Sequence, residues 1–152
     1  MTIKVAASAV ALLMGTTLAL NAQAQPKPED LVKQRKAALT LHGKYFGPIG
    51  AMVQGKAPYD AKIVARNAAY LAVLSEMPWD GFAASTEGVK DTRAKPEIYK
   101  ERAKFDKAAM DMRDAVAKLN AAAKSGDEGA VKAAFGATGK TCKACHDAYR
   151  KD

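Results

Sequence analysis

The segment Cys142-Lys143-Ala144-Cys145-His146 has the order C-x-x-C-H, which is the attachment signature of a c-type haem. Two thiols three residues apart can each add to a haem vinyl group and form thioethers, and the adjacent imidazole then ligates the iron. The motif uses both cysteines of the chain and one of its two histidines. We therefore expect one covalently attached haem c, bound through Cys142 and Cys145, with His146 as the metal ligand.

The motif alone leaves other roles for the two cysteines open. A thioredoxin-like dithiol lies within a βαβ pattern, and no strand-like alternation is found near this motif. A structural zinc site needs four ligands, whereas the chain offers two cysteines, His146 and the distant His42. A disulfide between Cys142 and Cys145 would close only a very small loop. Haem attachment is therefore the favoured interpretation, and a redox or structural thiol pair is its competitor.

Residues 1–24 have the features of a secretory signal peptide. Lys4 supplies a positive charge, an apolar run follows from Val5 to Leu20, and Ala22-Gln23-Ala24 fits the A-x-A cleavage rule. The apolar run is short for a membrane-spanning helix, so cleavage is favoured over a retained membrane anchor. We expect a soluble periplasmic protein that begins at Gln25, which agrees with haem attachment outside the cytoplasm.

The net charge of the chain indicates which classes of binding partner are favoured. Lysine and arginine number 24 against 16 acidic residues, which gives a formal charge of +8. Removal of residues 1–24, which contain one lysine and no acid, lowers this to +7. A positive charge favours encounters with acidic partners. Nucleic acid is not expected as a partner, because the basic residues are spread over helical surfaces and no recognition motif is present.

Apolar residues recur at three- and four-residue steps in four segments, which predicts four helices at about residues 28–47, 60–77, 96–124 and 127–149. Gly47-Pro48 is expected to stop or kink the first helix. Asp60 and Asp127 are expected to cap the second and fourth. No segment alternates at period two. The fold class is therefore all-α: residues 25–152 form an antiparallel four-helix bundle, with a long second connection and the haem in the bundle interior.

Seven short segments along residues 25–152 carry a family resemblance. They are Pro28-Glu29-Asp30, Arg35 with Ala38-Leu39-Thr40-Leu41, Ala57-Pro58-Tyr59-Asp60, Pro78-Trp79 with Phe82, Thr86-Glu87-Gly88, Pro96-Glu97-Ile98, and the run from Cys142 to Arg150. Their order, with four helices and a C-terminal haem motif, resembles the class II c-type cytochromes, and within them cytochrome c′. In the class I group the motif lies near the N-terminus instead.

The resemblance implies a function. Members of the family hold a five-coordinate haem iron, bind NO and CO at it, and have proposed roles in electron transfer and NO binding. On this basis His146 is the proximal ligand and Leu39 of the first helix blocks the distal side. The resemblance also implies a homodimer formed through the first two helices. No side chain is placed by a motif as a general acid or base, so an enzyme is not expected.

The resemblance assigns further residues to the haem surroundings. Arg35 matches a position that contacts the haem propionate region. A charged residue on an otherwise apolar stripe costs free energy unless it is paired, and either a propionate or an acid such as Asp30 would pair it. Thr86 and Glu87 match a loop near the haem edge. Arg150 matches a basic residue near the proximal pocket.

A second class of function remains open. His42 lies three residues after Leu39 on or beside the same helical stripe, and it can in principle reach the iron. A sixth protein ligand, His42 or a methionine, would make a low-spin electron carrier without a gas-binding site. The methionines that follow residue 25 lie outside the predicted first helix, and core packing is expected for them. They are Met52, Met77, Met110 and Met112.

Overall fold

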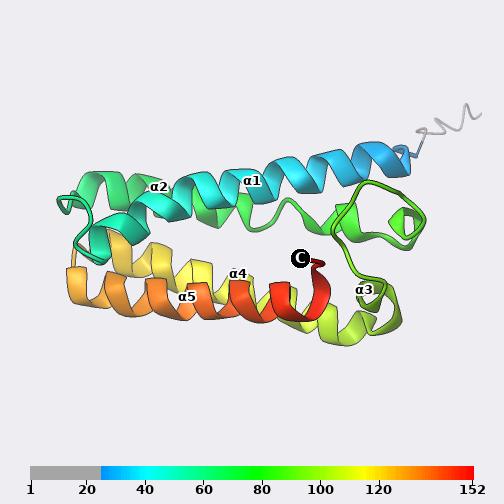
Figure 1. The fold of residues 1–152 in the computed structure, drawn as a ribbon. Helices are drawn as coiled ribbons and strands as arrows, with labels where there is room; N and C mark the ends of the chain where they lie inside the picture. Colours follow the sequence, from blue (N-terminus) through cyan, green and yellow to red (C-terminus); the bar gives the residue numbers. More distant parts are fainter. Residues whose placement is uncertain (1–24) are drawn as a thin grey trace, which may run out of the picture.

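The computed structural model describes residues 25–152, and the predicted signal peptide lies outside this part of the chain. The helices in chain order are α1 (Pro28–Val53), α2 (Ala61–Leu74), η1 (Trp79–Phe82), η2 (Ala84–Thr86), α3 (Glu97–Lys100), α4 (Arg102–Ser125) and α5 (Glu128–Tyr149). The four long helices lie side by side as an antiparallel bundle (Figure 1). The predicted all-α class and four-helix bundle are thus confirmed.

The first helix is longer than predicted. α1 begins with Pro28 in its first turn, where proline's missing N–H is tolerated, and two acids there complement the helix dipole. It does not end at Gly47-Pro48 but continues to Val53. Packing explains the extension, because Ile49 and Val53 are both buried in the core beyond the proline. Met52 consequently lies within the first helix, contrary to the sequence-based expectation.

The predicted N-caps of the second and fourth long helices are confirmed. The side-chain oxygen Oδ1 of Asp60 accepts hydrogen bonds from the backbone N–H groups of Lys62 (2.8 Å) and Ile63 (3.1 Å). Oδ1 of Asp127 accepts one from the N–H of Ala130 at 3.0 Å. Both carboxylates satisfy N–H groups that have no partner within the helix. These caps fix where α2 and α5 begin.

The predicted third helix is divided in two. Glu101, with φ −113° and ψ 43°, leaves the helical conformation between α3 and α4. This break allows Ile98 of α3 and Phe105 of α4 to enter the same apolar cluster. The apolar stripe predicted for the segment is otherwise as expected, since all of its members are buried. They are Ile98, Phe105, Ala109, Met112, Val116 and Leu119.

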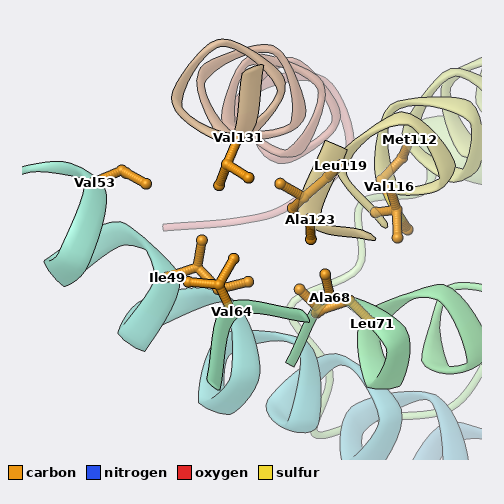
Figure 2. Packing of buried hydrophobic residues seen from close by; sticks show 10 residues of the cluster. All are labelled: Ile49, Val53, Val64, Ala68, Leu71, Met112, Val116, Leu119, Ala123 and Val131. Carbon is orange, nitrogen blue, oxygen red and sulfur yellow. The ribbon is translucent and has the colours of Figure 1, made fainter. Parts of the chain in front are cut away.

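The interior contains two apolar clusters. The first draws on all four long helices, whose side chains point toward one another in Figure 2; it comprises Ile49, Val53, Val64, Ala68, Leu71, Met112, Val116, Leu119, Ala123 and Val131. The second cluster comprises Phe82, Ile98, Phe105 and Tyr149. Trp79 packs against both clusters. Within residues 25–152 no helix combines the length and apolar character needed to cross a membrane.

Candidate haem-binding site

The two cysteines lie one turn apart on α5, and both are free, half-buried thiols. A three-residue spacing places them on the same side of the helix. Cys142 packs against the first apolar cluster and Cys145 against the second, so the motif lies where the two clusters approach each other. Burial raises the pKa of both thiols above the usual value. The pair therefore forms no disulfide and faces the apolar interior.

His146 lies in the last turn of α5, with an exposed side chain. It lines a polar hollow together with Arg93, Lys95, Asp147 and Arg150, and with Lys151 and Asp152 of the C-terminal segment. Desolvation lowers the pKa of His146, and the charges of Arg150 and Arg93 lower it further, whereas Asp147 opposes them. The lowered pKa favours the neutral imidazole, which is the form that binds a metal.

The side chain of Arg35, on α1, is buried, with only 2% of the residue exposed. Its guanidinium donates hydrogen bonds to the carbonyl oxygen of Gly81, to Oγ1 of Thr86 (3.4 Å) and to Oγ1 of Thr92 (2.8 Å). None of these oxygens carries a charge. Asp30 pairs with Lys33 instead, and Arg35 forms no ion pair with a carboxylate of residues 25–152. A buried cation without an anion suits a haem propionate.

Thr86 lies against Arg35 and is fully buried. Its hydroxyl oxygen is 2.7 Å from the carbonyl oxygen of Ala83 and 2.9 Å from the Tyr99 hydroxyl. A threonine hydroxyl has one proton and two lone pairs. The hydroxyl therefore donates to a carbonyl oxygen, that of Ala83 or that of Gly81 at 3.2 Å, and accepts from Arg35 and Tyr99. Glu87, its neighbour in the sequence, is exposed and forms no side-chain hydrogen bond with the described residues.

Leu39 and His42 both lie on α1, one turn apart. Leu39 is 39% exposed, so side chains of residues 25–152 do not enclose it. The His42 ring is half-buried, and its Nδ1 lies 2.8 Å from the carbonyl oxygen of Ala38, so Nδ1 carries the proton. Its Nε2 is buried without a partner among the described residues. Burial lowers the pKa of His42, against the opposing effect of the Ala38 hydrogen bond.

A short backbone bridge joins the loop before α3 to the end of α5 and the residues that follow it. The N–H of Lys95 donates to the Tyr149 carbonyl (2.9 Å), and the N–H of Lys151 donates to the Arg93 carbonyl (2.7 Å). Two side chains of the loop reinforce this bridge. Nε of Arg93 donates to the Lys151 carbonyl (3.0 Å), and Nζ of Lys95 donates to the Asp147 carbonyl (2.9 Å). The bridge places basic residues beside the turn that carries the motif histidine.

Several residues of this region carry no signal in the sequence. Thr92 and Tyr99 hold the Arg35 group, and Arg93 and Lys95 flank His146, yet each is an ordinary surface residue type in a loop or a short helix. Their partners lie 13 to 58 residues away in the chain. Only the path of the long connection brings them to the site.

The donor set fits haem c. Two half-buried thiols on one face of α5 are suited to thioether bonds, and the neutral imidazole that follows them is suited to iron. Arg35 is a buried cation without a carboxylate partner among residues 25–152, and such a cation could pair with a propionate. No group of three or more His, Cys, Asp or Glu side chains arranged for a metal ion is found among residues 25–152.

Comparison with known proteins gives the family. Residues 30–150 match the family described as Cytochrome C'. The chain is 47% identical over 125 residues to a cytochrome c' from Alcaligenes xylosoxydans xylosoxydans, covering 82% of this chain and 96% of that protein. It is 44% identical over 125 residues to a cytochrome c' from Rubrivivax gelatinosus, covering 82% of this chain and 97% of that protein.

Solved structures agree. The crystal structure of the Rubrivivax gelatinosus protein superposes with a TM-score of 0.80 and 44% identity, covering 82% of this chain and 98% of that one. The nitric oxide complex of a mutant of cytochrome c prime from Alcaligenes xylosoxidans superposes with a TM-score of 0.77 and 46% identity, covering 83% and 98%. This chain belongs to the cytochrome c′ family, whose cofactor is covalently bound haem c.

Proposed function

We propose that this chain is a periplasmic c-type haem protein that exchanges one electron and binds NO or CO at a five-coordinate iron. The proposal rests on one observation above all: two half-buried thiols on one face of α5 are followed directly by a histidine in the last turn of that helix. Cys142 and Cys145 would hold the haem, and His146 would take one axial position. Haem, when bound, supplies an iron centre for electron exchange and for gas binding.

The buried group around Arg35 would anchor a propionate. Arg35 is held by neutral oxygens on two sides, and Thr86 is held in turn by Tyr99. A side chain whose position is fixed in advance loses little entropy when an anion binds to it. Glu87 lies next to Thr86 in the sequence, and we propose that it borders the haem edge. Arg150 would stand beside the proximal ligand, whose pKa it lowers.

Leu39 would determine what enters the distal side. A leucine side chain has no atom that can ligate iron and no hydrogen-bond donor or acceptor to offer water. Small apolar molecules give up fewer hydrogen bonds than water does on entering an apolar pocket of this kind. The nitric oxide complex solved for the Alcaligenes xylosoxidans relative supports gas binding in this family.

His42 supports a second candidate, a six-coordinate low-spin electron carrier. Because the proton is on Nδ1, the lone pair of the ring is on Nε2, which is buried and has no partner among the described residues. That is the form of histidine that ligates iron. Among the methionines, Met52 and Met112 belong to or pack against the first apolar cluster, whereas Met77 and Met110 are exposed. We therefore rank His42 ahead of any methionine as the alternative distal ligand.

We further propose a homodimer formed through α1 and α2. Leu39 aside, most of the large apolar side chains that are exposed in residues 25–152 lie on these two helices or directly after them, and they are Leu41, Tyr70, Val73 and Met77. Burying such side chains between two copies would be favourable. Sedimentation of the mature protein should then give a dimer, and Val73→Glu should give a monomer with an unchanged visible spectrum.

Optical spectra of the purified periplasmic protein test the function directly. The oxidised and reduced forms are recorded before and after addition of CO or NO, for the wild type and for His42→Phe. High-spin bands that change with gas in both proteins support the five-coordinate iron. A low-spin wild type that ignores gas, and becomes high-spin in His42→Phe, supports the second candidate. The lack of any haem spectrum contradicts both, and intact-mass analysis checks cleavage before Gln25.

A further inference from the structure

The end of the bundle around His146 is basic. Arg93, Lys95, Arg150 and Lys151 line the same polar hollow as the motif histidine, and we call these four residues the basic patch. None of the four forms an ion pair with a carboxylate of residues 25–152. No carboxylate in this part of the protein therefore neutralises their positive charges, and three of the four residues, Arg93, Arg150 and Lys151, are exposed.

The patch is held in place by the backbone. The bridge between the loop before α3 and the chain after α5 fixes Arg93 and Lys95 relative to Lys151. The head group of Arg93 donates to the backbone carbonyl of Lys151, and that of Lys95 donates to the backbone carbonyl of Asp147 in the last turn of α5. Charges fixed in this way are better pre-organised for a partner than those on freely rotating surface side chains.

The acids nearby do not cancel the patch. The same hollow contains Asp147 and Asp152. Asp147 is engaged by Lys143 at 2.5 Å, so its charge is matched by a cation outside the patch. Asp152 is left against four cations. The electrostatic potential around His146 is therefore positive, and the net charge of the mature chain has the same sign.

We propose that the basic patch is the docking surface for an acidic redox protein. This inference rests on the proposed function, because its purpose is to bring an electron donor or acceptor to the turn that carries the haem ligand. Opposite charges steer the encounter of two proteins and can raise the association rate by about 10- to 1,000-fold, with a steep dependence on salt. The partner is thus identified by a surface rich in Asp and Glu.

An anionic membrane surface fits the patch less well. Membrane-surface binding combines cations with apolar side chains that enter the lipid. None of the exposed large apolar residues among residues 25–152 belongs to the patch; they lie on α1, on α2, directly after α2, or on α4. A polar rim of arginine and lysine around a redox centre instead suits a short-lived protein complex with a small interface.

Stopped-flow electron transfer from a reduced plant-type [2Fe–2S] ferredoxin of net negative charge tests the inference. The haem-loaded wild type is compared with Lys95→Glu/Lys151→Glu and with Lys62→Glu/Lys132→Glu, which has the same net charge but changes the opposite end of the bundle. We expect a drop of about 10-fold or more in the second-order rate constant for the patch variant at low salt. The control variant should stay within about 2-fold of the wild type, since distant charges are screened.

Further readouts keep the result decisive. Lys95→Glu removes a hydrogen bond and could disturb the fold, so Lys151→Glu is also measured alone. The Lys151 head group forms no hydrogen bond with the described residues, and its replacement should lower the rate constant in the same direction by a smaller factor. Equal losses in both double variants, or none in either, overturn the docking surface while leaving the haem function intact. Co-sedimentation with phosphatidylglycerol vesicles that depends on the patch, without a change in the ferredoxin rate, overturns it in favour of a membrane. A protein without a haem spectrum overturns both the function and this inference.

Discussion

The guanidinium carbon of Arg35 lies 4.4 Å from the centroid of the Phe82 ring. This stacking joins α1 to η1, the first turn of the long second connection. The same guanidinium donates to oxygens at three positions of that connection. A single buried side chain of α1 therefore holds most of a 22-residue connection, residues 75–96, against the bundle, and the proposed propionate site depends on that anchorage.

Replacing Arg35 with lysine should destabilise the protein although the charge is kept. A lysine ammonium cannot stack on Phe82 as a plane, and it cannot reach oxygens on two sides at once. We expect the free energy of unfolding in urea to fall by about 1–3 kcal/mol, the cost of leaving buried polar groups unpaired. Arg113→Lys is the control, because this half-exposed arginine forms an ion pair with Glu76 that lysine can keep, and its guanidinium lies farther from an aromatic ring, 5.9 Å from the Trp79 centroid. Equal losses at both positions would contradict the anchoring role.

The hydroxyl of Thr86 should contribute more to the stability of the protein than the shape of the side chain does. Thr86→Val keeps the shape of the side chain but removes the donor to a backbone carbonyl and the acceptor for Arg35 and Tyr99. We expect a loss of about 1–3 kcal/mol in the free energy of unfolding, because buried partners are left unsatisfied. Thr40→Val is the matched control, since Thr40 is exposed and bonds only to the Lys36 carbonyl of its own helix. A similar loss in the control would show that the effect is not due to burial.

The sequence predicts the parts of this fold that are governed by local rules. Asp60 and Asp127 cap helices because their side chains reach N–H groups two or three residues ahead. The apolar stripe of α4 is buried because its period matches the helix. The predicted end of α1 was wrong because it relied on Pro48, which is a local signal for helix termination. The burial of Ile49 and Val53, which lie beyond the proline, depends on contacts with other helices that no local pattern contains.

The candidate site divides in the same way. Cys142, Cys145 and His146 lie within five consecutive residues, so their chemistry is visible in the sequence. Arg35 is visible as a charge on an apolar stripe, but its oxygen partners are not, because they lie 46 to 57 residues away on an irregular connection. That connection follows no helical period, and its path is set by the side chains that it packs against. Sequence periodicity therefore finds the helices of this site and misses the loop.

Gly81 should not tolerate a larger side chain. A Cβ atom added there would lie 2.5 Å from Cβ of Arg35 and 2.7 Å from the carbonyl oxygen of Leu31, so the connection and α1 would have to move apart. We expect Gly81→Ala to lower the free energy of unfolding by about 1–3 kcal/mol, as overpacking does. Gly43→Ala is the opposite case, because a Cβ there meets nothing within 4 Å. As a glycine inside α1, its replacement should stabilise the protein by about 0.5–1 kcal/mol. Thermal and urea unfolding of the two variants should move in opposite directions.

His42 should make stability depend on pH below neutrality. Burial lowers its pKa in the folded state from the usual 6.5. The unfolded chain therefore binds more protons as the pH falls through 6.5, and the free energy of unfolding decreases between that value and the lower folded-state pKa. One such group contributes a slope of at most about 1.4 kcal/mol per pH unit. His42→Asn keeps a donor for the Ala38 carbonyl but does not titrate in this range. The difference in unfolding free energy between wild type and variant should shrink from pH 7 to pH 5, with His146 present in both. A difference that stays constant with pH would show that His42 is solvated as freely in the folded protein as in the unfolded chain.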